Sequence, residues 1–170
     1  MRASARTPAI IATVVALLIA LQYALSFVPG VELVTVTFVA FSCVFGCKRA
    51  VITATAFSLL RQLVFGFYPP VLVLYLVYFN LLGLIVGAIG ARFAGSPRLG
   101  LMVAVSAVST LCFTLLDNVI TPLWLGYSAN TFWLYFKASL PFALIQTACA
   151  VVSTAALFKP LVKVFGKFAN

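Results

Sequence analysis

Long apolar stretches, each separated from the next by a short polar or turn-forming segment, make up almost the whole chain. A helix needs about 20 residues to cross a hydrocarbon core of roughly 30 Å. The pattern marks out six such stretches, at residues 9–28, 31–46, 50–67, 71–91, 99–125 and 131–158. Open sheet edges are not stable in lipid, so all six are predicted to be helices. The sequence therefore predicts an all-α integral membrane protein whose single domain, residues 1–170, contains six transmembrane helices.

The segments between the stretches carry turn and charge signals. Pro29 and Gly30 close the first stretch, Lys48 and Arg49 separate the second from the third, and residues 92–98 hold the densest Gly, Ser and Pro signal. Composition agrees with this division, because 65% of the residues are hydrophobic and only 8% are charged, against about 25% charged in soluble domains. An ordinary soluble domain is excluded.

Basic residues set the orientation, because lysine and arginine in short loops favour the cytoplasm. If the six spans alternate, nine of the eleven basic residues lie on one side of the membrane. We expect both termini to be cytoplasmic and interpret the net charge of +9 as a topology signal, with no nucleic-acid partner. The nine residues are Arg2, Arg6, Lys48, Arg49, Arg92, Arg98, Lys159, Lys163 and Lys167.

Four charged residues fall inside or at the ends of the apolar stretches: Glu32, Arg61, Asp117 and Lys137. Their positions, at a rise of about 1.5 Å per residue, place all four in the outer half of the membrane. Charges at such depth usually face a bundle interior or a cavity. The quartet predicts a pocket for a ligand that carries charges of both signs. The alternative is structural pairing among the four, with the two cations extending towards the interface.

Polar and aromatic residues at similar heights extend the predicted ligand-binding site. Aromatic walls with a few convergent polar groups are typical of small-molecule pockets. The alternative for the tryptophans is an interfacial belt. The candidate ligand-binding residues are Glu32, Arg61, Gln62, Asp117, Asn118, Trp124, Trp133 and Lys137.

Small residues recur at helical spacing in two places. Ala12, Ala16 and Ala20 lie along one face of the first predicted helix, and Ala9 and Ala24 extend the same stripe. A second stripe, Gly83, Gly87 and Gly90, lies in the fourth predicted helix. Such stripes allow another helix to approach closely. Either stripe can be used inside the bundle or by a partner protein.

Several activities lack the residues they need. The chain has no histidine, which excludes serine–histidine chemistry and histidine–metal sites, and its two acids are too few for a magnesium cluster. Cys43 and Cys47 share a helical face, and we interpret them as packing residues. No phosphate-binding loop for ATP hydrolysis is present. We expect no enzyme activity, metal or cofactor, and active transport would need a partner or an ion gradient.

The chain resembles the substrate-binding S component of energy-coupling-factor vitamin transporters. The resemblance is carried by the small size, the six predicted helices with cytoplasmic ends, the alanine face Ala12, Ala16 and Ala20, and the segment at residues 28–35, VPGVELVT. It implies a vitamin-like ligand held near the outer surface of a prokaryotic plasma membrane. It also implies a transmembrane coupling subunit, contacted through the alanine face, and two cytoplasmic ATPase subunits.

The sequence thus predicts a membrane protein that captures a small polar or zwitterionic micronutrient for ATP-driven uptake. One alternative is an autonomous secondary carrier or channel that uses Glu32 or Asp117 as an ion or proton site. Another is a membrane interaction protein that transports nothing, in which the four charges are structural.

Overall fold

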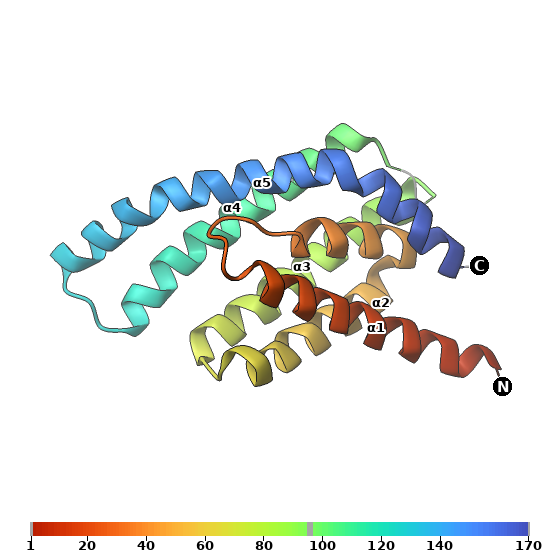
Figure 1. Cartoon of the computed structure of the whole chain (residues 1–170), viewed down its shortest axis with the longest axis horizontal. Helices are drawn as coiled ribbons and strands as arrows, with labels where there is room; N and C mark the ends of the chain where they lie inside the picture. The colour runs from red at the N-terminus through yellow and green to blue at the C-terminus, as the bar shows by residue number, and fades with distance from the viewer. Residues whose placement is uncertain (1, 95–96, 170) are drawn as a thin grey trace.

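The computed structural model describes residues 2–94 and 97–169. Gly95 and Ser96 of the predicted linker, and the side chain of Arg2, lie outside the described part. Five helices form the structure: α1 (Arg2–Leu25), α2 (Val34–Phe65), α3 (Pro69–Arg92), α4 (Leu99–Trp124) and α5 (Ala129–Ala169) (Figure 1). All five are long and apolar enough to cross a membrane, and the described residues form no strand. The all-α fold is confirmed, and five helices of this length and apolarity support a multi-pass membrane protein.

Helix α2 combines the second and third predicted spans, so the structure has five helices where six were predicted. The two helical segments of α2 meet at Gly46, whose φ of 76° and ψ of 175° are not helical. Glycine adopts positive φ without a steric penalty, so the chain can turn back within one residue, as Figure 1 shows. Lys48 and Arg49, predicted as a loop, are helical, and the Arg49 guanidinium lies 5.4 Å from the centre of the Phe45 ring.

The other boundaries differ at the first and last helices. Helix α1 ends at Leu25, before residue 28, and the connection that follows contains Gly30 at φ 79°. Helix α5 continues beyond residue 158 to Ala169. Its last turns are amphipathic, because Phe158 and Phe165 are buried while lysines occupy the exposed face. The lysines gave this segment a loop-like composition, although their spacing is helical.

The first segment of α2, Val34 to Phe45, forms the centre of the core. Every residue from 34 to 43 is buried. The ring of Phe38 packs edge-on against Phe79 of α3 at 5.4 Å, and that of Phe41 packs against Phe165 of α5 at 5.8 Å. At about 1.5 Å per residue the segment is roughly 18 Å long, shorter than a membrane core of ~30 Å. It is surrounded by protein, which suits a helix that is apolar on all sides.

The glycine stripe of α3 packs against α2 at the break. A Cβ atom at Gly87 would lie 2.5 Å from the Cys47 backbone nitrogen, and one at Gly90 would overlap the Cys43 carbonyl oxygen. The two helices therefore approach to backbone contact. This stripe is used inside the fold.

The ends of the helices separate into two groups along the molecule. Helix α1 begins, and α3 and α5 end, towards the right of Figure 1, whereas the α4–α5 hairpin projects at the left beyond the other elements. Helix α5 packs on α4 and α2, and α1 packs on α2. The connection at residues 26–33 folds back between α1 and α5, where it covers a cavity.

Candidate ligand-binding site

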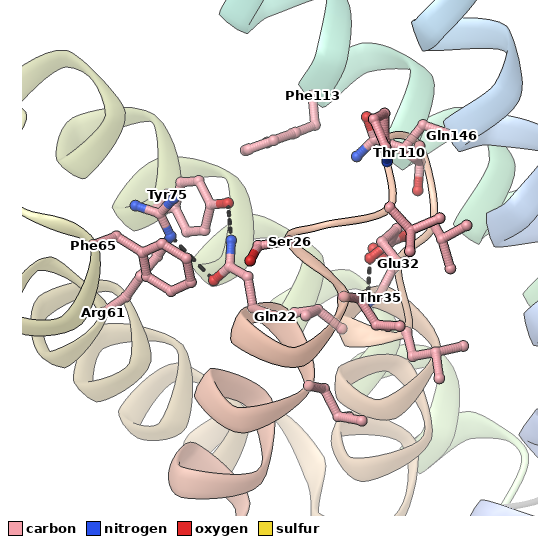
Figure 2. A pocket seen from close by; sticks show the side chains of 18 of the residues that line it. Gln22, Ser26, Glu32, Thr35, Arg61, Phe65, Tyr75, Thr110, Phe113 and Gln146 are labelled. Atoms are coloured by element: carbon pink, nitrogen blue, oxygen red, sulfur yellow. Dashed lines mark hydrogen bonds between the residues drawn. The ribbon is translucent and has the colours of Figure 1, made fainter.

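A cavity of about 300 Å³ lies where the end of α1, residues 26–33 and the four other helices meet. Residues from all five helices line it, so it belongs to the bundle interior. Figure 2 shows two polar groups facing each other across it, one around Arg61 and one around Glu32. Its volume lies at the lower end of the range for small-molecule sites, roughly 300–1,000 Å³.

Arg61, on the second segment of α2, is held by three contacts. Its Nε donates to Gln22 Oε1 at 3.1 Å, and Gln22 Nε2 donates to the Tyr75 hydroxyl at 2.7 Å. The guanidinium carbon lies 4.2 Å from the centre of the Tyr75 ring and 4.8 Å from that of Phe65. These rings stabilise the cation by their quadrupoles and fix its plane. The terminal guanidinium nitrogens form no hydrogen bond or ion pair with the described residues.

Glu32 lies at the opposite side of the cavity, just before α2 begins. Its Oε2 accepts a hydrogen bond from the Thr35 backbone N–H at 3.1 Å, a favourable position for a carboxylate near a helix N-terminus. Its Oε1 is buried and has no hydrogen-bond partner among the described residues. Burial raises the pKa of the Glu32 carboxyl above its ordinary value, and the Thr35 N–H opposes this rise.

The connection that carries Glu32 is fastened to α5. The Glu32 backbone N–H donates to Cys149 Sγ at 3.4 Å, and the Cys149 thiol donates to the Glu32 carbonyl at 3.6 Å. Gly30 adopts a positive φ, and a Cβ there would lie 2.6 Å from Ile145 Cγ2. The close approach to Ile145 therefore requires glycine at position 30.

Two further polar atoms in the cavity wall lack a hydrogen bond of ordinary geometry. They are the Tyr78 hydroxyl, whose polar neighbours are Thr35, Ser109 and Thr110, and Thr110 Oγ1. Buried polar atoms in folded proteins are usually hydrogen-bonded to protein or water. Together with Glu32 Oε1 they form a set of buried groups that a bound molecule can satisfy. The arrangement supplies charge, hydrogen bonds and aromatic surface, which are the requirements for binding.

The structure brings two members of the predicted site, Glu32 and Arg61, into this cavity. Asp117 lies within electrostatic range of Arg61 but forms no ion pair with it, and its Oδ1 accepts from Thr121 Oγ1 at 2.9 Å. Gln62 and Asn118 are buried outside the cavity lining.

Gln62 has a local role at the turn between α2 and α3. Its Oε1 accepts the Tyr68 backbone N–H at 3.2 Å. The amide nitrogens of Gln62 and Asn118 are buried without a partner among the described residues.

The other three predicted residues lie on the projecting α4–α5 hairpin. Trp124 is 60% exposed and Trp133 is 57% exposed, and the Lys137 side chain is also exposed. Trp133 packs only against rings of its own helix among the described aromatic residues, Phe132 and Phe136. None of the three lines the cavity.

Charge alone did not identify several residues of the site. Gln22 and Gln146 are each the one glutamine of their helix, so an uncharged polar residue inside an apolar span was an available signal. Tyr75, Tyr78 and Phe113 gave no distinguishing signal, because aromatic residues are common throughout these helices. The cavity residues absent from the predicted site include Gln22, Ser26, Thr35, Phe65, Tyr75, Tyr78, Thr110, Phe113 and Gln146.

The predicted partner-binding residues Ala12, Ala16 and Ala20 are exposed on α1. The opposite face of α1 is buried through Ile11, Val14, Val15 and Leu18. Ala12 and Ala16 line an apolar groove of about 540 Å³ between α1 and the second segment of α2, whose wall includes Ala56. Unlike the glycines of α3, these alanines are not used in packing inside the fold.

Among the described residues no group of three potential metal ligands occurs. Comparisons with known protein families, with curated proteins and with solved structures found no match to the chain.

Proposed function

We propose that this protein is the substrate-binding subunit of an energy-coupling-factor transporter and captures a vitamin-like micronutrient for ATP-driven uptake. The cavity carries the proposal: Arg61 and Glu32 enter it from different elements, and neither forms an ion pair within the described residues. Charges inside a membrane protein are costly and usually serve a function. A cavity that leaves both unpaired is better suited to a ligand than to structural pairing.

The proposed topology follows from the same elements. The first segment of α2 is too short to cross the membrane alone, but the two segments of α2 run in opposite directions. With α1, α3, α4 and α5 the chain therefore has six alternating segments, which would leave both chain ends on one side of the membrane. The basic residues favour the cytoplasm for that side, in a prokaryotic plasma membrane. The cavity then faces outwards, where a dilute nutrient is captured.

The exposed alanine face supports a partner. Close helix packing in lipid depends on small residues, and the groove beside Ala12 and Ala16 is lined by apolar residues apart from Thr7. We propose that a transmembrane coupling subunit docks on this face and that two cytoplasmic ATPase subunits drive the cycle.

The test is mass spectrometry of the small molecules and proteins that copurify with the tagged protein from its host. A bound micronutrient together with a coupling subunit and ATPases is the expected result. Solute uptake by the protein alone in liposomes would instead establish an autonomous carrier. Recovery of the protein without ligand, partner or transport would favour a structural role for the charges.

A pair of matched variants tests the docking face. Ala16→Leu fills the groove and is expected to reduce the copurified coupling subunit roughly tenfold, because the helices can no longer approach closely. Ala138→Leu, at an exposed position of α5, is the control and should leave recovery unchanged. Equal recovery with both variants would place the interface elsewhere.

A further inference from the structure

We propose that the cavity binds a small planar zwitterion, with an anionic group at Arg61 and a protonated nitrogen at Glu32. This inference rests on the proposed capture function and adds the chemical class and orientation of the ligand. It depends on the two polar groups, the rings between them and the size of the cavity.

The Arg61 side of the cavity is suited to a carboxylate. A guanidinium carries five N–H donors in a plane, and the hydrogen bonds of Arg61 to the described residues use only the Nε donor. Phe65 and Tyr75 hold that plane by cation–π contacts, and Gln22 holds its position. A guanidinium held in this way, whose terminal nitrogens make no hydrogen bond with the described residues, matches the two oxygens of a carboxylate.

The Glu32 side is suited to a donor with positive charge. Oε2 is occupied by the Thr35 N–H, whereas Oε1 is buried and unpartnered. The other buried polar atoms in the cavity wall that lack a hydrogen bond of ordinary geometry are the hydroxyls of Tyr78 and Thr110. A protonated nitrogen neutralises the carboxylate and supplies the missing hydrogen bond, which a neutral donor does only in part.

Aromatic rings line the space between the two sides. Phe113 contacts Tyr75 edge-on, with ring centres 5.2 Å apart, and Tyr78 at 4.6 Å. Figure 2 shows the Phe113 side chain extending from α4 toward the Tyr75 side of the cavity. Flat apolar surface at this place favours a ring, since aromatic pairs stack offset or edge-on.

The size and charge of the cavity exclude other classes. A volume of about 300 Å³ accommodates a compound with one or two rings and excludes a corrinoid. A purely anionic ligand would leave Glu32 Oε1 buried without a hydrogen-bond partner, and a purely cationic ligand would place a like charge beside Arg61. A ligand with both charges satisfies the two sides together.

Three probes of matched shape test this: para-(aminomethyl)benzoate, benzylamine and para-methylbenzoate. Binding to the purified full chain is measured by saturation-transfer NMR and competition. The zwitterion is expected to bind at least roughly tenfold more tightly than either half, because each half lacks one charge-assisted hydrogen bond. Equal binding of all three, or no transfer to the zwitterion, would overturn the proposal.

Variants of Arg61 and Glu32 test which charged group of the ligand each residue binds. Arg61→Gln should lower zwitterion binding to the level of benzylamine, and Glu32→Gln should lower it to the level of para-methylbenzoate. Arg92→Gln, at the exposed end of α3, is the matched control and should have no effect. If Arg61→Gln does not fold, Arg61→Lys keeps the charge without the planar donors and should weaken binding while preserving the preference. The same loss with Arg92→Gln would also contradict the proposal.

The two proposals fail separately. If a coupling subunit and ATPases copurify but the released compound has charge of one sign, the ligand class is wrong and capture stands. If the zwitterion preference is present but no such partner copurifies, the ligand class stands and the transporter proposal fails.

Discussion

The Arg61–Glu32 cavity and the tip of the α4–α5 hairpin contain similar residue types, yet only in the cavity are the charged side chains enclosed by neighbouring residues. Both combine charge with aromatic rings inside apolar helices. In the cavity the guanidinium is fixed by two rings and a glutamine. At the hairpin tip, Trp124, Trp133 and Lys137 are exposed.

The difference shows that depth along a helix does not define a site in a membrane protein. Residues at one depth can face the bundle or the lipid, and the neighbouring helices decide which. The cavity receives residues from all five helices, whereas the hairpin tip has only α4 and α5. Exposed tryptophans at a helix end suit an interfacial belt.

The largest effect on stability is expected at the close contact between α2 and α3. Gly87→Ala should reduce the free energy of unfolding by about 1–3 kcal/mol, because the added methyl overlaps the backbone at Cys47. Gly100→Ala, at the start of α4 with open space around it, is the control. Denaturant unfolding in detergent measures both, and equal stability of the two variants would contradict the close α2–α3 contact.

An aromatic exchange in each region sharpens the contrast. Tyr75→Leu removes the ring over Arg61 and the hydroxyl that accepts from Gln22. The affinity for the ligand, followed by the amount retained through purification, should fall roughly thirtyfold, since a desolvated cation–π contact contributes ~2 kcal/mol. Trp133→Leu, at the hairpin tip, should retain as much ligand as the unmodified protein. A loss of retained ligand with Trp133→Leu would indicate that the hairpin tip contributes to ligand binding.

The Glu32 carboxyl is expected to make the stability of the ligand-free protein depend on pH. Its pKa in the folded protein is raised above 4.5 by burial, so folding favours the protonated form. This contribution of Glu32 to stability is fully present below about pH 4.5. It is lost as the pH rises through the pKa that the carboxyl has in the folded protein. Thermal unfolding of the ligand-free protein should therefore show decreasing stability from that pH upward.

Glu32→Gln should flatten this decrease. Tyr78→Phe and Cys149→Ala remove the titratable neighbours on α3 and α5 and should leave the slope in place. A slope that persists in Glu32→Gln would assign the dependence to another group.

The smallest effect is expected at the hairpin tip. Ser128 Oγ accepts the Thr131 backbone N–H at 3.4 Å, in an exposed helix N-cap. Ser128→Ala should reduce the free energy of unfolding by roughly 0.5–1 kcal/mol and leave ligand binding unchanged. Calorimetry and ligand retention check the two parts, and a change in retention would connect the tip to the cavity.

The sequence predicted the helical class because long apolar stretches in lipid allow little else. It predicted a loop between the second and third spans at Lys48 and Arg49, whereas the chain turns at Gly46 and one glycine joins the two segments of α2. The continuation of α5 to Ala169 was missed because the lysines of this segment were interpreted as a sign of a loop. The helical spacing of its apolar residues was not considered.

The candidate site was predicted in part for a similar reason. Glu32 and Arg61 were identifiable because charge inside an apolar stretch is rare. Gln22 and Tyr75 depend on which face of each helix turns inward, and helices that are apolar all round do not reveal that face. The exposed alanine stripe of α1 and the packed glycine stripe of α3 were likewise indistinguishable in the sequence, and the close contact at Gly87 separates them.

The break at Gly46 has a consequence for biosynthesis. The segment from Val34 to Phe45 is covered by residues made after it, with Phe79 packing on Phe38 and Phe165 packing on Phe41. During translation this short helix leaves the ribosome long before α5 exists. It therefore waits in an incomplete bundle until nearly the whole chain is synthesised, and the cavity it supports is among the last parts of the protein to form.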